Sequence, residues 1–130
     1  MRKAYNAKNA FVSGPYSHAI DGGDYIFFSG QTAMNTLSKD DAKEIQDDIA
    51  AQTEQCFKNL FDVMEETDLT EADVVKVNVY LTDMNDFEAV NAVYEKQFSA
   101  PHPARTCIAV LALPLGANIE IEMIAKARTK

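Results

Sequence analysis

The 130-residue chain has few cysteines, few histidines and no long apolar run. Its two cysteines, Cys56 and Cys107, lie 51 positions apart and neither is part of a Cys-x-x-Cys spacing. This spacing excludes a disulfide framework and a structural zinc site, and it favours a reducing compartment. The residues after Met1 do not form a signal-peptide core, and no apolar stretch is long enough to cross a bilayer. We therefore expect a cytoplasmic protein without a metal site or a membrane partner.

Positive charge is also scarce. Lysine and arginine number 12 against 20 aspartates and glutamates, which gives a net charge of −8 and an isoelectric point near 4.6. Clustered cations supply most of the affinity for a phosphate backbone, so the composition argues against nucleic-acid binding. Fifteen of the acids fall between Asp40 and Glu88, a distribution typical of solvated helix faces.

The length suits one domain, and the 47% of hydrophobic residues are enough for one core. No linker, repeat or low-complexity stretch divides the chain. We predict a single domain over residues 1–130, which is too short to include a separate cofactor module.

The spacing of apolar residues predicts an α+β domain in the order ββ, α, β, α, ββ. A short strand over Ala10–Ser13 and an aromatic-rich strand over Asp24–Ser29 are expected to form a hairpin around Gly22-Gly23. Helical spacing then predicts one long amphipathic helix from Asp40 to about Asp68.

The second half of the chain continues the pattern. Alternation over Val75–Leu81 predicts a half-buried strand. Asn85, with Glu88 three residues later, looks like the N-cap of a second helix that ends near Phe98. The last two strands are expected to pair as a hairpin: Arg105–Leu111 and Ile119–Ala125, joined by a turn at 114–116.

Two helices cover only one face of such a sheet, so the other face needs a partner. Alternate positions of the Arg105–Leu111 strand mix cysteine, alanine and leucine with single charges, and such a face is poorly suited to bulk water. We therefore expect a homo-oligomer with charged groups at a subunit seam, and we expect the functional site on the uncovered face.

Arg105 is the one arginine away from the chain ends, because the other two are Arg2 and Arg128. It follows a rigid Pro-His-Pro-Ala segment and opens a predicted strand. A planar fork of donors held in this way suits a bidentate carboxylate, which points to a small anionic ligand. The alternative is a structural ion pair with Glu120 or Glu122 across the predicted hairpin.

Glu120 and Glu122 share one strand face, about 7 Å apart at the usual rise per residue. Two carboxylates at this spacing can divide acid and base work, although surface acids on an alternating strand are the ordinary case. Glu120 lies near the start of the strand expected to pair with the Arg105 strand. Together, the two side chains would hold an acid and activate water.

Four further residues allow two interpretations each. Cys107 is a nucleophile only if its thiolate is stabilised, and a small buried hydrophobe otherwise. Tyr16 either fills a gap in the packing at the surface or provides a flat ring that a ligand contacts. Ser29 and Gly30 offer a hydroxyl and close approach to backbone N–H groups, or they form a simple turn.

Five separated motifs occur in one order along nearly the whole chain. They are Gly14-Pro-Tyr-Ser17, Phe28-Ser-Gly-Gln31, Val90-Asn-Ala-Val-Tyr94, Pro103-Ala-Arg-Thr-Cys107 and Ile119-Glu-Ile-Glu-Met-Ile-Ala125. Together they resemble the reactive intermediate deaminase family, RidA/YjgF. The resemblance implies a chorismate-mutase-like α+β fold, a mixed sheet with two helices on one face, and a homotrimer with a site in each cleft between subunits.

The resemblance also implies an activity, the hydrolysis of reactive 2-imino and 2-enamino acids such as 2-aminoacrylate to a 2-keto acid and ammonium, with no cofactor. By the same resemblance, Arg105 binds the substrate carboxylate and Glu120 positions or activates water. The other residues that match the lining of the cleft are Tyr16, Ser29, Gly30, Asn91 and Cys107. Two alternatives stay open: a non-enzymatic regulator that binds a small carboxylate, and an endoribonuclease that inhibits translation.

Overall fold

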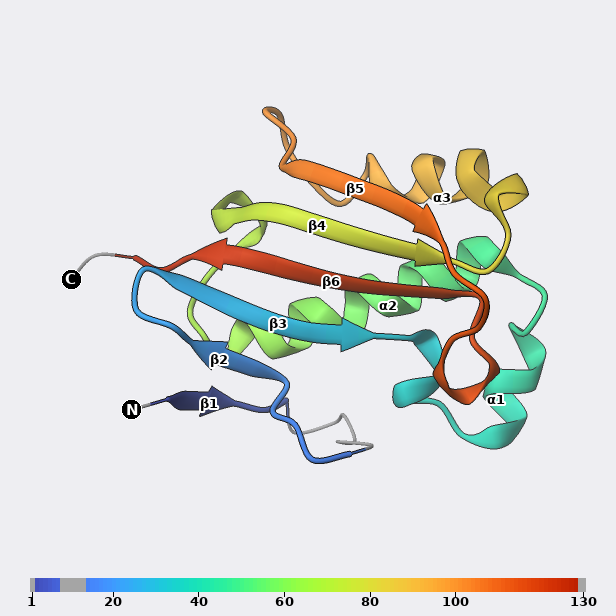
Figure 1. The fold of residues 1–130 in the computed structure, drawn as a ribbon, viewed down its shortest axis with the longest axis horizontal. Helices are drawn as coiled ribbons and strands as arrows, with labels where there is room; N and C mark the ends of the chain where they lie inside the picture. The colour runs from blue at the N-terminus through green and yellow to red at the C-terminus, as the bar shows by residue number, and fades with distance from the viewer. Residues whose placement is uncertain (1, 8–13, 129–130) are drawn as a thin grey trace.

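A computed structural model describes residues 2–7 and 14–128. In these residues, six strands form one mixed sheet in the order β1-β2-β3-β6-β4-β5, with β4 and β5 parallel and all other neighbours antiparallel (Figure 1). The strands are β1 (Lys3–Tyr5), β2 (Ala19–Asp21), β3 (Tyr25–Gln31), β4 (Val74–Leu81), β5 (Ala104–Ala109) and β6 (Ile119–Lys126). The predicted α+β class is confirmed.

The β2–β3 hairpin turns at Gly22-Gly23, as predicted, but its first strand is Ala19–Asp21, which the sequence analysis did not predict. Gly23 has a φ of 100°, a left-handed conformation that glycine adopts without steric cost. The strand before the turn is β2, which pairs with β3 in antiparallel register. The strand predicted over Ala10–Ser13 lies outside the described residues.

The predicted long helix is two helices, α1 (Lys39–Glu44) and α2 (Ile49–Glu65). The Asp48 carboxylate accepts a hydrogen bond from the Ala51 N–H and thereby begins α2 anew. The Gln52 side chain donates to the carbonyls of Ile45 and Gln46, which satisfies the backbone where α1 has ended. The prediction of one continuous helix was therefore wrong, because the chain is not helical between α1 and α2.

The next helix, α3, spans Phe87–Tyr94 and ends before Phe98. Asn85 is not its N-cap, because Asp83 caps a 3-10 turn at Met84–Asp86 and α3 continues directly from that turn. The other 3-10 turns are η1 (Ala33–Asn35), η2 (Glu71–Asp73) and η4 (Pro114–Gly116).

Helices α2 and α3 lie on one face of the sheet and leave the other face open (Figure 1). The core between these layers combines aliphatic strand residues with an aromatic cluster from the helices. In this cluster the ring of Phe57 lies 5.7 Å from that of Tyr94 and 5.8 Å from that of Phe98, between centroids and edge to face. The structure thus confirms the prediction that two helices cover one face of the sheet.

The last two strands are not a hairpin, because β4 lies between β5 and β6. In the register, Val77 of β4 is opposite both Arg105 and Met123, and these side chains point toward the helices. Asn78, one position on, is opposite Glu122, and this row points to the open face. The predicted pairing of the Arg105 strand with the Glu120 strand was therefore wrong.

The open face carries large apolar side chains as well as acids. Tyr25, Phe27 and Ile108 are 42%, 48% and 45% exposed on this face. Exposed rings and a branched aliphatic chain on one sheet face are typical of an interaction surface. In the part of the chain that the structure describes, no helix is long and apolar enough to cross a membrane.

Candidate functional site

The open face has a hollow of about 310 Å³ at one end of strands β3 and β6. We call it the Glu120 hollow. Its lining residues are Tyr16, Ser29, Gly30, Asn35, Pro114, Glu120 and Glu122. Four of them are residues that the sequence predicts for the site: Tyr16, Ser29, Gly30 and Glu120.

An irregularity in β3 forms one wall of this hollow. The register with β6 shifts between Phe28 and Gln31, which takes Ser29 and Gly30 out of the regular ladder. The Ser29 hydroxyl donates to the Ser17 carbonyl at 2.6 Å and anchors the loop that carries Tyr16. A Cβ at position 30 would lie 2.8 Å from Glu120 Oε2, so only glycine lets this carboxyl lie against the backbone.

The two glutamates of the hollow have different surroundings. Glu122 accepts hydrogen bonds from Asn78 Nδ2 at 3.1 Å and from the Tyr80 hydroxyl. The hydrogen bond to Glu122 raises the pKa of Tyr80 to about 12. Burial, followed by the charge of Glu122, raises the pKa of Glu120 above its ordinary value.

Arg105 lies on the opposite face of the sheet, against α3. Its Nη1 donates to Asn91 Oδ1 at 2.6 Å. Its Cζ lies 4.7 Å from the ring centroid of Tyr94 and 5.4 Å from that of Phe87. The amide and the two rings hold the guanidinium plane without neutralising its charge. We call this site the Arg105 edge, because β5 is the last strand of the sheet.

No carboxylate pairs with Arg105 among the described residues, whose ion pairs are Lys58–Asp62 and Arg128–Asp73. The alternative of an ion pair with Glu120 or Glu122 across a hairpin is therefore wrong within one chain. The prediction that Arg105 lies on the uncovered face was also wrong. The physical reason is strand order: with β4 inserted, Arg105 falls in the row of side chains that faces the helices.

Cys107 follows Arg105 on the same side of β5 and packs against the core. Burial raises the pKa of its thiol, and the nearby Arg105 charge offsets only part of this effect. A thiol with a raised pKa is a poor nucleophile, so the interpretation of Cys107 as a small apolar residue fits best. In residues 2–7 and 14–128, no group of three potential ligands could hold a metal ion.

The predicted site residues thus form two half-sites in one chain. The Glu120 hollow contains Tyr16, Ser29, Gly30 and Glu120, and the Arg105 edge contains Asn91, Arg105 and Cys107. The sheet separates the two groups. One chain therefore does not bring the predicted carboxylate-binding group to the predicted water-activating group.

Residues 7–127 match a protein family described as Endoribonuclease L-PSP. The chain belongs to this family. Relatives within it confirm the resemblance to RidA/YjgF. The chain is 39% identical over 132 residues to the 2-iminobutanoate/2-iminopropanoate deaminase of Escherichia coli K12, covering 98% of this chain and 100% of that protein. It is 42% identical over 113 residues to Protein HMF1 of Saccharomyces cerevisiae, covering 87% and 84%.

Solved structures of the Endoribonuclease L-PSP family share the fold. RidA from the Antarctic bacterium Psychrobacter sp. PAMC 21119 matches with a TM-score of 0.83 at 34% identity, over 95% of this chain and 98% of that one. The YjgF gene product of Escherichia coli matches with a TM-score of 0.82 at 36% identity, over 97% and 99%. One relative carries the name Protein mmf1, mitochondrial, so a cytoplasmic location stays a prediction for this family member.

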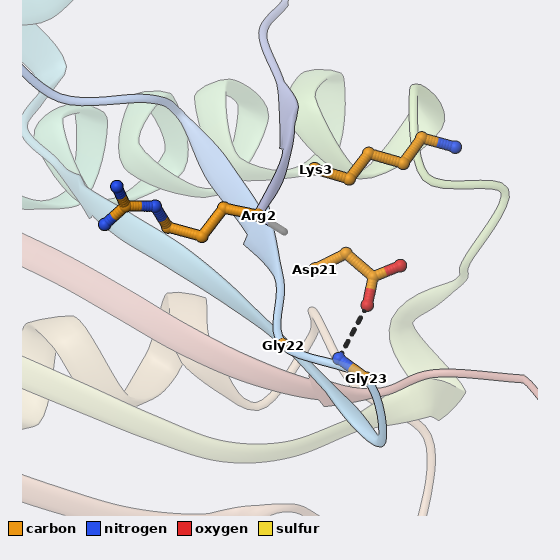
Figure 2. Close-up of a pocket in the computed structure, with 5 residues that line it drawn as sticks. All are labelled: Arg2, Lys3, Asp21, Gly22 and Gly23. Atoms are coloured by element: carbon orange, nitrogen blue, oxygen red, sulfur yellow. Dashed lines mark hydrogen bonds between the residues drawn. The ribbon is translucent and has the colours of Figure 1, made fainter.

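A second hollow of about 790 Å³ lies at the opposite end of the sheet, beside the Gly22-Gly23 turn. Figure 2 shows the Arg2 and Lys3 side chains extending away from each other and the Gly23 N–H directed to Asp21 Oδ1, at 2.8 Å. This hollow contains none of the residues that the family resemblance points to.

Sequence reasoning did not assign Asn78 and Tyr80 to the site. Both alternate with valines along β4, which is the ordinary pattern of a half-exposed strand. Their relevance depends on the β4–β6 register, which places Asn78 opposite Glu122 and Tyr80 opposite Glu120. No local signal in the sequence reports that register.

Proposed function

We propose that the protein hydrolyses reactive 2-imino and 2-enamino acids, such as 2-iminobutanoate, 2-iminopropanoate and 2-aminoacrylate, to the 2-keto acid and ammonium. The observation that carries this proposal is the charge complementarity of the two half-sites. Arg105 is held in place without a carboxylate, and Glu120 lies in a hollow without a cation, among the described residues. The name of the Escherichia coli relative supports the same substrate class.

The proposal requires the two half-sites to meet between copies of the chain. In a cyclic homotrimer, the Arg105 edge of one copy faces the Glu120 hollow of the next, which makes three equal clefts and closes the ring. The exposed apolar side chains of the open face, Tyr25, Phe27 and Ile108, favour such burial. We expect no nucleic-acid or membrane partner and no cofactor.

The chemistry follows from these positions. The Arg105 guanidinium takes the substrate carboxylate, and the adjacent C=N carbon then lies toward Glu120 of the neighbouring copy. Glu120 orients a water molecule at that carbon. Asn91 and Cys107 beside Arg105, and Tyr16, Ser29 and Gly30 beside Glu120, would line the cleft. Imines react readily with water, so the reduction of the barrier that this sparse site must supply is modest.

The test uses 2-aminoacrylate generated in situ by a serine dehydratase, with loss of the imine followed over time. The wild-type protein should accelerate this loss, and Arg105→Ala should lower kcat/KM by about 100-fold or more, because the carboxylate loses its charged partner. Arg128→Ala removes an arginine that pairs with Asp73 and belongs to neither half-site, and it should be fully active. Equal activity of the two variants would contradict the assignment of Arg105.

A regulatory protein that binds a small carboxylate is the second candidate, because the Arg105 edge alone is sufficient to bind an acid. Tight, Arg105-dependent binding of a 2-keto acid in calorimetry, without acceleration of imine loss, would favour it. RNA cleavage is less consistent with this chain. A net charge of −8 and an acid-lined hollow oppose a phosphate backbone, although the description of the family includes the word endoribonuclease.

A further inference from the structure

The pairing of β4 with β6 supplies Glu122 with two hydrogen-bond donors. Asn78 Nδ2 and the Tyr80 hydroxyl both donate to the same carboxylate oxygen, Oε1. Donors directed at a carboxylate stabilise its ionised form. A phenol donates this bond only while it is neutral, and Tyr80 stays neutral well beyond physiological pH because its pKa is raised to about 12. In the Glu120 hollow, Glu122 is therefore the carboxyl that two donors hold in place.

Glu120 differs from Glu122 although it lies on the same strand face. Its carboxyl packs over the backbone of Gly30, and no donor or cation reaches it among the residues that the structure describes. The charge of Glu122 lies about 7 Å away along the strand and opposes a second negative charge at Glu120. Burial of the Glu120 carboxyl also raises its pKa.

The other groups around Glu120 do not supply a compensating positive charge. Those that titrate are Tyr80 and Lys76 from β4, Tyr16 from the loop before β2, and Cys56 from α2 behind the sheet. The facing wall from β3 consists of Ser29 and Gly30, which carry no charge. Lys76 is one row farther from Glu120 than Glu122 is, and its Nζ donates to Thr106 Oγ1 at 2.8 Å. The position of the proton in the hollow therefore depends chiefly on the two glutamates.

We propose that Glu122 is a positioning residue that keeps a proton on the adjacent Glu120, and that Glu120 delivers this proton to the CH₂ carbon of a 2-enamino acid. This inference rests on the proposed function. The π electrons of the C=C bond form the new C–H bond, the nitrogen lone pair forms the C=N bond, and Glu120 is left as a carboxylate.

The resulting carboxylate then accepts a proton from the water that attacks the iminium carbon, which returns Glu120 to its starting state. In the carbinolamine, the hydroxyl proton moves to nitrogen as the C–N bond breaks, so the products are the 2-keto acid and ammonia. In the substrate complex, Arg105 of the neighbouring copy does not cause Glu120 to lose its proton, because the substrate carboxylate occupies that guanidinium. One carboxyl thus serves as acid and then as base.

The decisive experiment is the pH dependence of kcat for 2-aminoacrylate in Glu122→Gln, because kcat reports the substrate complex, in which the substrate carboxylate occupies Arg105. An acid catalyst is lost as pH rises through its pKa, so Glu120 produces the alkaline limb of the profile. Removing the charge of Glu122 lowers the pKa of Glu120, and we expect that limb to move to lower pH by about one unit. Glu54→Gln removes an equal charge from an exposed position on α2 and should leave the limb unchanged.

Tyr80→Phe provides a second variant with a different expected signature. It keeps the carboxyl of Glu122 but removes one of its two donors, so Glu122 is held less firmly beside Glu120. The plateau of kcat should fall about three-fold while the alkaline limb does not move to lower pH. A purely structural role of the Tyr80–Glu122 bond would lower activity in the same way in Tyr80→Phe, but it would leave the alkaline limb of Glu122→Gln unmoved, so that limb distinguishes the two roles.

Titration of the carboxyl carbons by ¹³C NMR separates this inference from the proposed function, because it needs no activity. With a saturating 2-keto acid bound at Arg105, the Glu120 resonance should titrate above the ordinary glutamate range in the wild type and at lower pH in Glu122→Gln. An active wild type whose alkaline limb and Glu120 midpoint are both unchanged by Glu122→Gln would overturn the inference alone. A wild type that does not accelerate imine loss would instead overturn the proposed function, and the catalytic use of the proton with it.

Discussion

The Arg105 edge and the Glu120 hollow hold their charges in different ways. At the edge, one helix presents an amide and two aromatic rings to Arg105, and the guanidinium is fixed and permanently charged. In the hollow, a bulged strand and an adjacent carboxylate hold Glu120, whose protonation can change. The proposed reaction needs a constant charge for binding and an adjustable one for proton transfer, and the two half-sites differ in this property.

The largest predicted effect tests whether the two half-sites act together. Each half-site is inactivated in a different chain. Arg105→Ala and Glu120→Gln should each be nearly inactive alone. Co-refolded at equal amounts, they should recover about one quarter of wild-type activity, since one cleft in four then combines an intact Arg105 edge with an intact Glu120 hollow. The measurement is the rate of 2-aminoacrylate loss in the mixed and separate preparations.

The control for this mixture is Arg105→Ala combined with the double variant that lacks both residues. That mixture cannot assemble an intact cleft by any exchange of subunits. Failure of the first mixture to exceed the second, with subunit exchange shown by mass spectrometry, would place the two residues in independent sites.

A smaller effect should follow from crowding the hollow without touching the edge. In Gly30→Ala, the new methyl would lie 2.8 Å from Glu120 Oε2, so the carboxyl must move. We expect kcat to fall about ten-fold with little change in KM, because the Arg105 edge still binds the carboxylate. Gly22→Ala, whose new methyl would lie 2.8 Å from the Phe27 ring at the other end of the sheet, tests whether any crowded glycine has this effect. An equal loss of kcat in both variants would contradict a specific role for Gly30.

The smallest predicted effect is on stability. The pKa of Glu120 is raised from 4.5, so the folded state binds more protons than the unfolded state as pH rises above this value. Folding stability therefore falls with rising pH over that window, and Glu120→Gln should remove the loss. We expect its Tm to exceed that of wild type by about 2 °C at pH 7 and to equal it at pH 4.

The matched variant for this measurement is Glu54→Gln, which neutralises an exposed acid on α2. Differential scanning calorimetry at both pH values gives the comparison directly. A Glu120→Gln protein that is less stable than wild type at pH 7 would contradict this prediction. It would show that the folded state favours the ionised form of the Glu120 carboxyl.

Much of the local structure could be predicted from the sequence. Alternating valines predict β4, the Gly22-Gly23 pair predicts the turn before β3, and apolar spacing predicts the helices. The break at Asp48 and the start of α3 could not be predicted in this way, because side-chain caps compete with helix continuation over only a few residues. The motifs around Arg105 and Glu120 also identified the residues of both half-sites.

By itself, the sequence determined which side chains share a strand face, because a period of two residues is a local property of the backbone. It placed Arg105 with Cys107, and Glu120 with Glu122. Only the tertiary structure decided which face each pair takes. The position of β4 between β6 and β5, with Val77 opposite Arg105 and Tyr80 opposite Glu120, depends on packing of the whole core, and it puts Arg105 and Glu120 on opposite sides of one sheet.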